Sequence, residues 1–543
     1  MNKCKLNFIF NAHLPFVRHP EYPRFLEEDW FFEAINESYI PLLRMMNRLK
    51  EDKVSFKLTF SLSPTLCAML DDELLKKRFE AFLNLHIELG HKEVERLQGD
   101  KNLLKLANMY LKNLQDNLDY YLNTCNRDIL GAFNVLSNEG YIELVTTCAT
   151  HAYLPIYKDY PVASNAQIEV GVSSHSKRFD SMPHGFWLPD CGFYPGLENL
   201  LVRNNIQWVS VASQALVLSD TVPKEGNYKP VCCENGLYCF PRDYNLTSLV
   251  WSSSEGYPGD PNYREFYRDI GYDLPMSYIG PYVHEPEVRV FTGYKYYAVT
   301  GQTSEKNVYD PEKASNIALA HGKNFIYHVN SRSQAALKSN IKDPVFTVSF
   351  DAELFGHWWY EGVMWLENVI RLSASSSTIE LSTPGSYINE EPDCQIMTPA
   401  FSSWGEGGYS HVWADSSTNA KYLRHIFKAL EHMEELAIRF PNQKSLKQRF
   451  ITQASREVLL LMASDWPYIM YNHSSEEYAK CRLEGHLKNF NLVYDNMCKN
   501  AVNTEWLVTA EKRNNLFPNL DYNIFNPMNL QNPSGVYTTD FSK

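Results

Sequence analysis

The sequence predicts an α/β protein, built either as a barrel or as an open parallel sheet. Short apolar segments with strand character alternate with longer helical stretches, as in folds whose parallel strands are joined by helices. Several of these short segments end close to a His or an Asp, and parallel sheets gather functional groups at such ends. The length of 543 residues and the hydrophobic content of 44% allow a large core with additional domains.

Six segments are predicted as strands. Each is short, apolar and bounded by polar or turn-forming residues, which is typical of buried strands in a parallel sheet. They are residues 5–11, 56–60, 142–148, 185–188, 206–212 and 345–350.

Helical patterns fill the chain between and after these strands. Residues 71–139 hold few glycines and no proline, and this stretch is long for a connection between strands, so we interpret it as a helical insertion at about 68–139. Residues 224–260 are rich in turn formers, and we expect an irregular excursion there. Beyond Pro399 the apolar periodicity predicts three helices, at 418–440, 446–463 and 475–502.

Charge and cysteine content exclude several classes of function. The net charge of −13 argues against binding to nucleic acid and does not favour an anionic membrane. No apolar run reaches the roughly 18 residues of a membrane span, and the N-terminal residues lack a secretion signal. The eleven cysteines form no CxxC pair or zinc spacing, which predicts free thiols in the cytoplasm. We expect no metal and no cofactor.

Four polar residues follow predicted strands and are expected to share one site. Loops at the C-terminal ends of barrel strands converge on one mouth, where catalytic groups gather. The four are His13, His151, Asp190 and Asp351. Trp187 lies near Asp190 in the sequence, and Trp359 follows Asp351, so flat aromatic surfaces that suit sugar rings accompany the carboxylates.

Two carboxylates without a metal motif point to the cleavage of a glycosidic bond. In the retaining reaction the two groups lie about 5 to 5.5 Å apart, and one attacks the anomeric carbon while the other protonates the departing oxygen. Asp351 suits the acid, because apolar neighbours raise a carboxyl pKa. Asp190 suits the nucleophile, because polar and exposed neighbours would keep it ionised. The alternative for either residue is a capping role at the start of the next helix.

Seven segments spread along nearly the whole chain carry a more specific signal. They read HLPFVRH at 13–19, GYIELVTTCATHAYLP at 140–155, GFWLPDCGFYPGLENLL at 185–201, VWSSSEGYPGDPNYREFYRDIG at 250–271, FDAELFGHWWYEG at 350–362, SSWGEGGYSHVWAD at 402–415 and LLLMASDWPYIM at 459–470. In this order they resemble the motifs of glycoside hydrolase family 57, and most of all those of its α-1,4-glucan branching enzymes.

This resemblance implies a fold and an activity. The fold would be a distorted (β/α)7 barrel over residues 1–397, with the helical insertion, and a C-terminal helical domain at 398–543 that contributes to the substrate cleft. The activity would be retaining cleavage of an α-1,4-glucan, such as amylose, glycogen or a maltooligosaccharide, and transfer to a 6-hydroxyl to form an α-1,6 branch. Hydrolysis of the α-amylase type is the alternative, because both reactions share the first chemical step.

The resemblance also assigns residues by position. Asp351 matches the acid/base and Asp190 the nucleophile, while His13 and His151 match histidines of the donor site. Arg264 would meet substrate or keep the nucleophile ionised. The other expected substrate contacts are Trp30, Trp187, Gly280, Trp359, Trp404, Trp413 and Asp465. Core packing is the alternative for each tryptophan, because indole rings are well buried on average.

The nucleophile position departs from the family pattern, which has Glu where this chain has Asp190. Aspartate is one methylene shorter, so its oxygen would lie about 1.5 Å further from the anomeric carbon on an unmoved backbone. A misplacement of about 1 Å can cost about 100-fold in rate. The chain would then be a slow enzyme, an enzyme whose loop has shifted, or a glucan-binding protein with little catalysis. Neither Glu198 nor Glu255 obviously substitutes.

Overall fold

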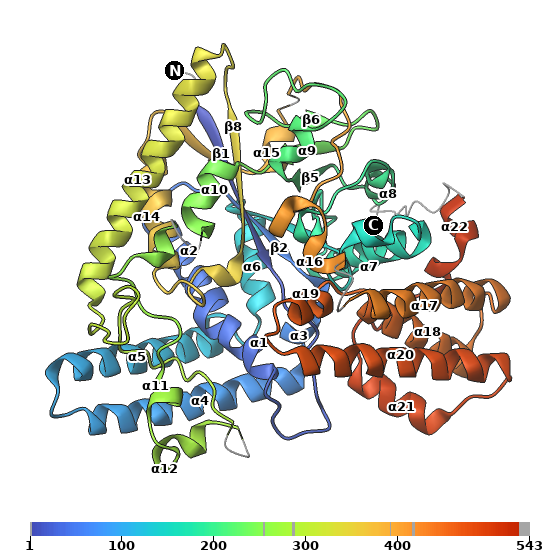
Figure 1. Ribbon diagram of the computed structural model, residues 1–543, viewed down its shortest axis with the longest axis horizontal. Coiled ribbons are helices and arrows are strands. Elements are labelled where there is room, and N and C mark those ends of the chain that lie inside the picture. The colour runs from blue at the N-terminus through green and yellow to red at the C-terminus, as the bar shows by residue number, and fades with distance from the viewer. Residues whose placement is uncertain (1–2, 253–255, 285–287, 391, 415–418, 532–543) are drawn as a thin grey trace.

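The computed structural model describes residues 3–252, 256–284, 288–390, 392–414 and 419–531. At its centre, seven parallel strands lie in the order β7-β5-β4-β3-β2-β1-β8 and curl toward a barrel (Figure 1). The strands of the sheet are β1 Cys4–Ala12, β2 Leu58–Leu62, β3 Ile142–Thr147, β4 Gly185–Trp187, β5 Trp208–Val211, β6 Val231–Cys232, β7 Tyr238–Pro241, β8 Val345–Asp351 and β9 Ile379–Ser382. The distorted (β/α)7 barrel expected from the sequence is confirmed.

Strand β1 organises the sheet. Strand β8 pairs with it from Lys5 to Asn11, which occupies one whole edge of β1. The other edge is shared, because β9 pairs with the residues at 4–7 and β2 with the residues at 9–12. The C-terminal ends of β1, β2 and β8 therefore lie side by side, and Asn11 stands opposite Asp351.

The barrel closes at a short contact between β7 and β8. A single bridge joins Arg242, just after β7, to Thr347 of β8, and the Asp243 N–H donates to the Thr347 carbonyl at 2.7 Å. Strand β8 itself is buried along nearly its whole length, as its near-continuous apolar sequence predicts.

Helices cover the outside of the barrel and extend to one side (Figure 1). Those that bear on the sites below are α1 Glu28–Ala34, η1 Ile35–Tyr39, α2 Ile40–Glu51, α4 Glu73–Arg96, α5 Lys101–Asp119, α6 Ile129–Asn138, α10 Tyr244–Trp251, α13 Pro311–Lys338 and α14 Gly362–Ala374. The helical pattern at 71–139 is confirmed by α4, α5 and α6. Each of these three begins at an aspartate, Asp72, Asp100 or Asp128, whose side chain accepts hydrogen bonds from the first turn.

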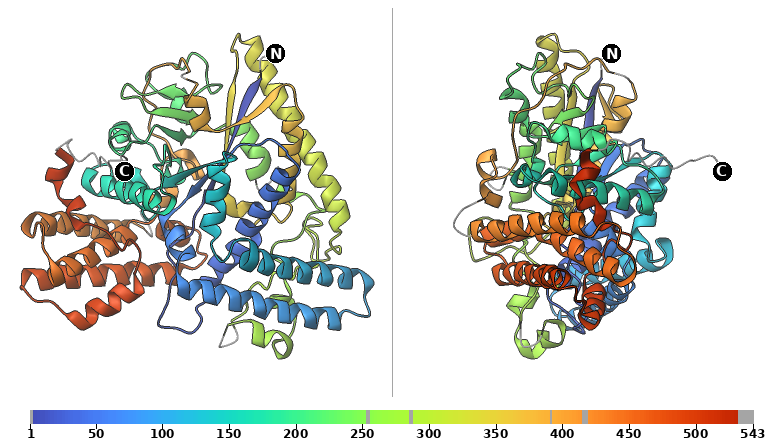
Figure 2. Two further views of the ribbon diagram at one scale, coloured as in Figure 1. Left: turned by 180° about the vertical axis from the view of Figure 1, so that it is seen from behind. Right: turned by 90° about the vertical axis from the view of Figure 1, so that its right-hand side faces the viewer.

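The chain after Pro399 is mainly helical and lies on the other side of the barrel (Figure 2). The three predicted helices are confirmed as α17 Ala420–Arg439, α18 Ser445–Leu461 and α20 Glu476–Cys498, with α19 Asp465–Tyr471 and α21 Thr504–Arg513 beside them. Helix α18 is buried continuously over its second half. The division into domains at residue 397 stays a prediction, and residues 532–543 of the second domain lie outside the described chain.

One expectation about the sheet was wrong, and one strand was not predicted. The segment at 224–260 is not irregular throughout, because it holds β6, β7 and α10, and β7 completes the barrel. Residues 253–255 of this segment, Glu255 among them, lie outside the described chain. Strand β9 was missed because it has four residues, too few for a periodic pattern. In the described residues, no helix is long and apolar enough to cross a membrane.

The barrel closure generates a prediction about stability. The buried Asp243 side chain caps α10 by accepting from the Leu246 N–H at 2.9 Å, and it pairs with Arg332 of α13 at 2.6 Å. Removing one partner of a buried ion pair typically costs about 3 kcal/mol. We expect Asp243→Ala to lower the free energy of unfolding by about that amount in chemical denaturation.

Asp273→Ala is the matched control for this substitution. Asp273 pairs with Arg268 at 2.8 Å, but both side chains are about one-third exposed, and exposed ion pairs contribute less than about 1 kcal/mol. Equal losses in the two variants would contradict the role given to Asp243.

Candidate active site

Three carboxylates and two histidines meet at the C-terminal ends of the barrel strands. His13 follows β1, His151 follows β3, Asp190 follows β4 and Asp351 is the last residue of β8. Asp465 joins them from the first turn of α19. We call these five residues the carboxylate cluster. The four polar residues that were predicted to follow strands therefore lie together, and Asp465 joins them. The five residues come from segments that are far apart in the sequence.

The two histidines form the centre of the carboxylate cluster. Their rings stack with centroids 3.9 Å apart, and His13 Nε2 lies 3.0 Å from an Asp465 carboxylate oxygen. The Asn11 amide donates to His151 Nε2 at 3.3 Å, so the His151 proton resides on Nδ1 and is donated to Ser464 Oγ at 2.9 Å. Burial, reinforced by His13, holds the His151 pKa well below its usual value, and its imidazole is neutral.

Asp351 is held in an environment that favours its proton. Burial raises the pKa of this carboxyl above its ordinary value, while the Asn11 amide, His13 and Arg242 oppose that rise. The direction agrees with the acid role expected from its apolar strand.

Asp190 sits at a sharp turn, the short helix η4 Pro189–Cys191, where its φ of 57° and that of Cys191 at 50° are left-handed. Trp404 fixes this turn twice: its N–H donates to the Asp190 carbonyl at 2.9 Å, and its indole Nε1–H donates to Oδ1 at 3.2 Å. The second carboxyl oxygen, Oδ2, is buried and accepts no hydrogen bond from the described residues.

The ionisation of Asp190 differs from the expectation. The pKa of its carboxyl is raised to about 8, mainly by burial and also by the charges of Asp351 and Asp465, against the opposing effects of Trp404 and Ser464. The sequence suggested that exposed, polar neighbours would keep Asp190 ionised, and this was wrong, because its loop is covered by the segment that carries Trp404.

Aromatic side chains surround Asp190. Trp187 meets the Trp404 ring edge-on at 5.3 Å but is only 2% exposed, so it supports Trp404 and presents no face to a ligand. Trp251, at the end of α10, lies parallel to Trp404 with centroids 6.3 Å apart and is 46% exposed. Arg242 stacks on Trp404 at 4.8 Å. Sequence reasoning missed Trp251, since its segment was expected to be irregular.

Three other tryptophans were expected to contact substrate, and the structure shows what each of them packs against. Trp359 and Trp413 are each 2% exposed, Trp359 in the main core and Trp413 stacked on Tyr153 at 4.6 Å. Neither leaves a ring face for a sugar, so the expectation of substrate contact is corrected for both. Trp30 is half-buried and meets the Tyr478 ring edge-on at 5.9 Å.

Arg264 and Gly280 also lie away from the carboxylate cluster. Arg264 stacks on Tyr360 at 4.0 Å in a separate cavity, and the cation that bears on the cluster is Arg242. The role of keeping Asp190 ionised is therefore corrected. Gly280 begins the short helix η6 Gly280–Tyr282, and a Cβ there would meet no atom within 4 Å. No close approach to the backbone explains this glycine.

Four residues of the site were missed by sequence reasoning. Asn11 and Ser464 contact cluster residues, and Arg242 stacks on Trp404 while its charge bears on Asp351. Glu353 accepts from the His13 N–H at 3.1 Å and from the Tyr39 hydroxyl. Burial raises the pKa of Glu353 to about 8. Asn11 gave a usable signal, as the last polar residue of a predicted strand. Across the described chain, no group of three or more His, Cys, Asp or Glu side chains is arranged to hold a metal ion.

A curled parallel barrel whose strand ends bring together carboxyl groups of raised pKa, beside an exposed indole, is the arrangement of a glycoside hydrolase. A family model described as Glycosyl hydrolase family 57 matches residues 7–399, and one described as 1,4-alpha-glucan branching enzyme, C-terminal, matches residues 425–525. The chain belongs to glycosyl hydrolase family 57.

Solved structures and curated relatives agree with this assignment. The alpha-amylase AmyC from Thermotoga maritima superposes with a TM-score of 0.91 at 37% identity, covering 97% of this chain and 99% of that one. A family 57-type branching enzyme from Pyrococcus horikoshii gives a TM-score of 0.86 at 30% identity, covering 96% and 97%. The 1,4-alpha-glucan branching enzyme of Thermococcus kodakarensis is 29% identical over 95% of this chain and 77% of its own length.

The raised pKa of Asp190 generates a prediction about pH. A carboxyl group attacks only when ionised, and Asp190 is protonated below its pKa of about 8 in the free enzyme. Cleavage also needs the proton of Asp351, so we expect kcat/KM for glycosidic cleavage to follow a bell-shaped curve with pH, in which the limb near pH 8 is set by Asp190 in the free enzyme. Trp404→Phe removes an indole hydrogen bond that favours the ion, so this limb should move up by about one pH unit. An unmoved limb would assign it to another group.

Proposed function

We propose that this chain is a 1,4-α-glucan branching enzyme. It cleaves an α-1,4 bond with retention of configuration and transfers the released chain to a 6-hydroxyl, which forms an α-1,6 branch. The observation that carries the proposal is the placement of Asp190 and Asp351 in one carboxylate cluster, where the charge of Asp351 raises the pKa of Asp190. The match of residues 425–525 to a branching-enzyme C-terminal region favours transfer over hydrolysis.

The two aspartates have different roles in the first step. Asp351, protonated through its burial, gives its proton to the glycosidic oxygen as that bond breaks. Asp190 Oδ2 forms an ester bond to the anomeric carbon. We assign Oδ2 because Oδ1 is held by the Trp404 indole while Oδ2 is left without a partner among the described residues.

The second step reverses these roles. The Asp351 carboxylate takes the proton of an incoming 6-hydroxyl, and that oxygen displaces Asp190 from the anomeric carbon. If water arrives in place of the hydroxyl, the outcome is hydrolysis. The neutral His151 and the His13–Asp465 pair lie beside both carboxyls and are placed to hydrogen-bond sugar hydroxyls.

Hydrolysis of the α-amylase type is the second candidate. It is favoured by the 37% identity and high TM-score to an enzyme named as an alpha-amylase. The two functions share the glycosyl ester and differ in whether water or a sugar reaches it.

One assay separates the candidates. Incubated with amylose, the purified protein should lower iodine staining and create ends that a debranching enzyme releases, with little rise in reducing ends. Asp351→Asn should lose about 1,000-fold in rate, because it removes the proton donor and later base. Reducing ends without new branches would select hydrolysis, and no turnover at high enzyme loading would defeat both.

Asp190→Glu tests the shortened nucleophile. Glutamate carries the carboxylate about 1.5 Å further from the fixed backbone, and positional errors of about 1 Å can cost about 100-fold, so we expect kcat to rise by up to that factor. A fall in kcat would show that the turn has already compensated for the shorter side chain. No turnover in either protein would identify a glucan-binding homologue.

Trp251 is expected to bind a glucosyl ring beside the cluster. An exposed indole parallel to Trp404 presents a flat face, and such aromatic contacts contribute about 0.5–1.5 kcal/mol. Trp251→Ala should raise KM for maltooligosaccharides about threefold to tenfold and leave kcat nearly unchanged. Tyr327→Ala, which removes an exposed ring on α13, is the control and should change neither. A fall in kcat alone would contradict the assignment.

We also propose that the enzyme acts in glycogen synthesis in the cytoplasm. All eleven cysteines are free, and the Cys233 and Cys239 sulfurs lie 3.8 Å apart without a bond, which is compatible with a reducing compartment.

A further inference from the structure

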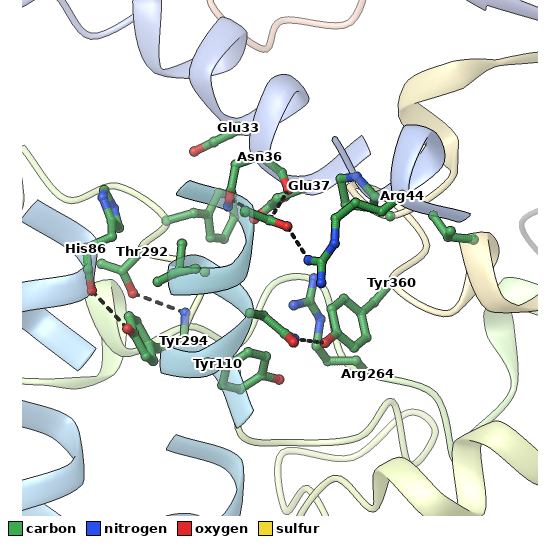
Figure 3. A pocket seen from close by; sticks show the side chains of 18 of the residues that line it. Glu33, Asn36, Glu37, Arg44, His86, Tyr110, Arg264, Thr292, Tyr294 and Tyr360 are labelled. Carbon is green, nitrogen blue, oxygen red and sulfur yellow. Dashed lines mark hydrogen bonds between the residues drawn. The ribbon is translucent and has the colours of Figure 1, made fainter. Parts of the chain in front are cut away.

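A second cavity lies between the α4–α5 hairpin and the barrel, and no residue of the carboxylate cluster lines it (Figure 3). Its volume is about 390 Å³, at the lower end of the range for small-molecule sites. Its walls come from α1, η1, α2, α4, α5, Arg264, residues 291–294 and the start of α14.

The wall formed by η1 is fixed in place. This single turn of π-helix interrupts the run from α1 to α2, and such turns are frequent at functional sites. Gly356 has a φ of 102° and packs so closely that a Cβ would clash with the Glu37 carbonyl. The Glu37 carboxylate is in turn paired with His357. The cavity is therefore preformed.

Most polar groups that line the cavity are satisfied by one another. Arg44 donates to the Asn117 amide oxygen at 2.6 Å, and Asn117 donates to the Asn36 carbonyl at 2.9 Å. The remaining pairs are Arg48 with Glu367 at 2.7 Å and Asn113 with the Tyr360 hydroxyl at 3.1 Å.

Three lining groups are left over: Arg264, Glu33 and His86, whose buried Nε2 has no partner among the described residues. Arg264 is only 8% exposed, yet its Nε–H has no acceptor, and the described residues place no carboxylate within ion-pair distance of its guanidinium. Glu33 makes neither a hydrogen bond nor an ion pair with any described residue, and burial together with the Glu37 charge raises its pKa well above the usual value. Glu33 is only half-buried, but buried groups such as Arg264 and His86 are costly when unpaired, so they point to a missing partner.

The chemistry of that partner follows from these groups. A cation would be repelled by Arg264 and an anion by the Glu37 carboxylate, which favours a neutral ligand. One hydroxyl can accept from the Arg264 Nε–H and another can hydrogen-bond to Glu33, so a ligand with several hydroxyls satisfies both. Rings of Phe291 and Tyr294 line the same cavity and suit the apolar face of a sugar ring.

We propose that this cavity is a second saccharide-binding site, which holds one or two sugar residues by Arg264 and Glu33 without taking part in the reaction. The assignment of the sugar as glucose from an α-glucan rests on the proposed function; the neutral polyhydroxyl class rests on the cavity alone.

The test uses the full chain with Asp351→Asn to prevent turnover and maltose as the probe. Calorimetric titration should reveal a binding event that Arg264→Met and Glu33→Leu each weaken tenfold or more, because each leaves one sugar hydroxyl without its partner. Arg268→Met is the matched control, since Arg268 is paired with Asp273 outside the cavity, and it should leave binding unchanged. Thermal unfolding of each variant checks that the fold persists, and crystals soaked in maltose locate the sugar.

The place where maltose binds tests both the second site and the proposed function. Binding in the cavity that is lost in both cavity variants supports the second site. If maltose also binds at the carboxylate cluster, the proposed function is supported too. Maltose at the cluster alone overturns the second site and leaves the proposed function standing. Maltose in the cavity alone supports the second site and counts against the proposed function, and binding at neither place overturns both. If Arg264→Met fails to fold, Glu33→Leu carries the same comparison.

Discussion

The parallel pairing of β1 with β8 is the constraint on which the site depends. It runs without a break from Lys5 to Asn11 and sets Asn11 opposite Asp351, so the acid and the amide that orients His151 are fixed by backbone hydrogen bonds. His13, the residue directly after β1, stacks on His151 and contacts Asp465, which comes from the C-terminal helices. A slip of β8 by one residue in this register would turn Asp351 to the other face of the sheet, away from Asn11.

Burial, and not a nearby cation, sets the proton affinities at this site. It raises the pKa of Asp351, of Asp190 and of Glu353, and it keeps His151 neutral. The consequence is a site that holds protons readily and depends on the Trp404 indole to favour the Asp190 ion. Raised carboxyl pKa values favour protonation of the leaving oxygen more than they favour attack by Asp190. The attack is also the step that the shorter side chain of Asp190 is expected to slow.

The short apolar runs predicted a parallel α/β fold, either a barrel or an open sheet, and the resemblance to glycoside hydrolase family 57 supplied the distorted (β/α)7 barrel. The sequence could not predict β9 or the strand role of β7, since segments of four residues have no measurable period. Composition identified tryptophans but not their exposure: Trp359 and Trp413 are packed in cores, while Trp251 presents its face. Arg264 lies in the cavity because it and residues 291–294 pack beside α4 and α5, a tertiary contact that no local pattern encodes.

Direct detection of a glycosyl ester is the measurement that tests the central claim most closely. Asp351→Asn incubated with α-maltosyl fluoride, whose leaving group needs no acid, should accumulate the intermediate because its breakdown lacks a base. The account predicts a maltosyl mass on the peptide that contains Asp190. A maltosyl group on another carboxylate, or none while wild-type protein branches amylose, would contradict it.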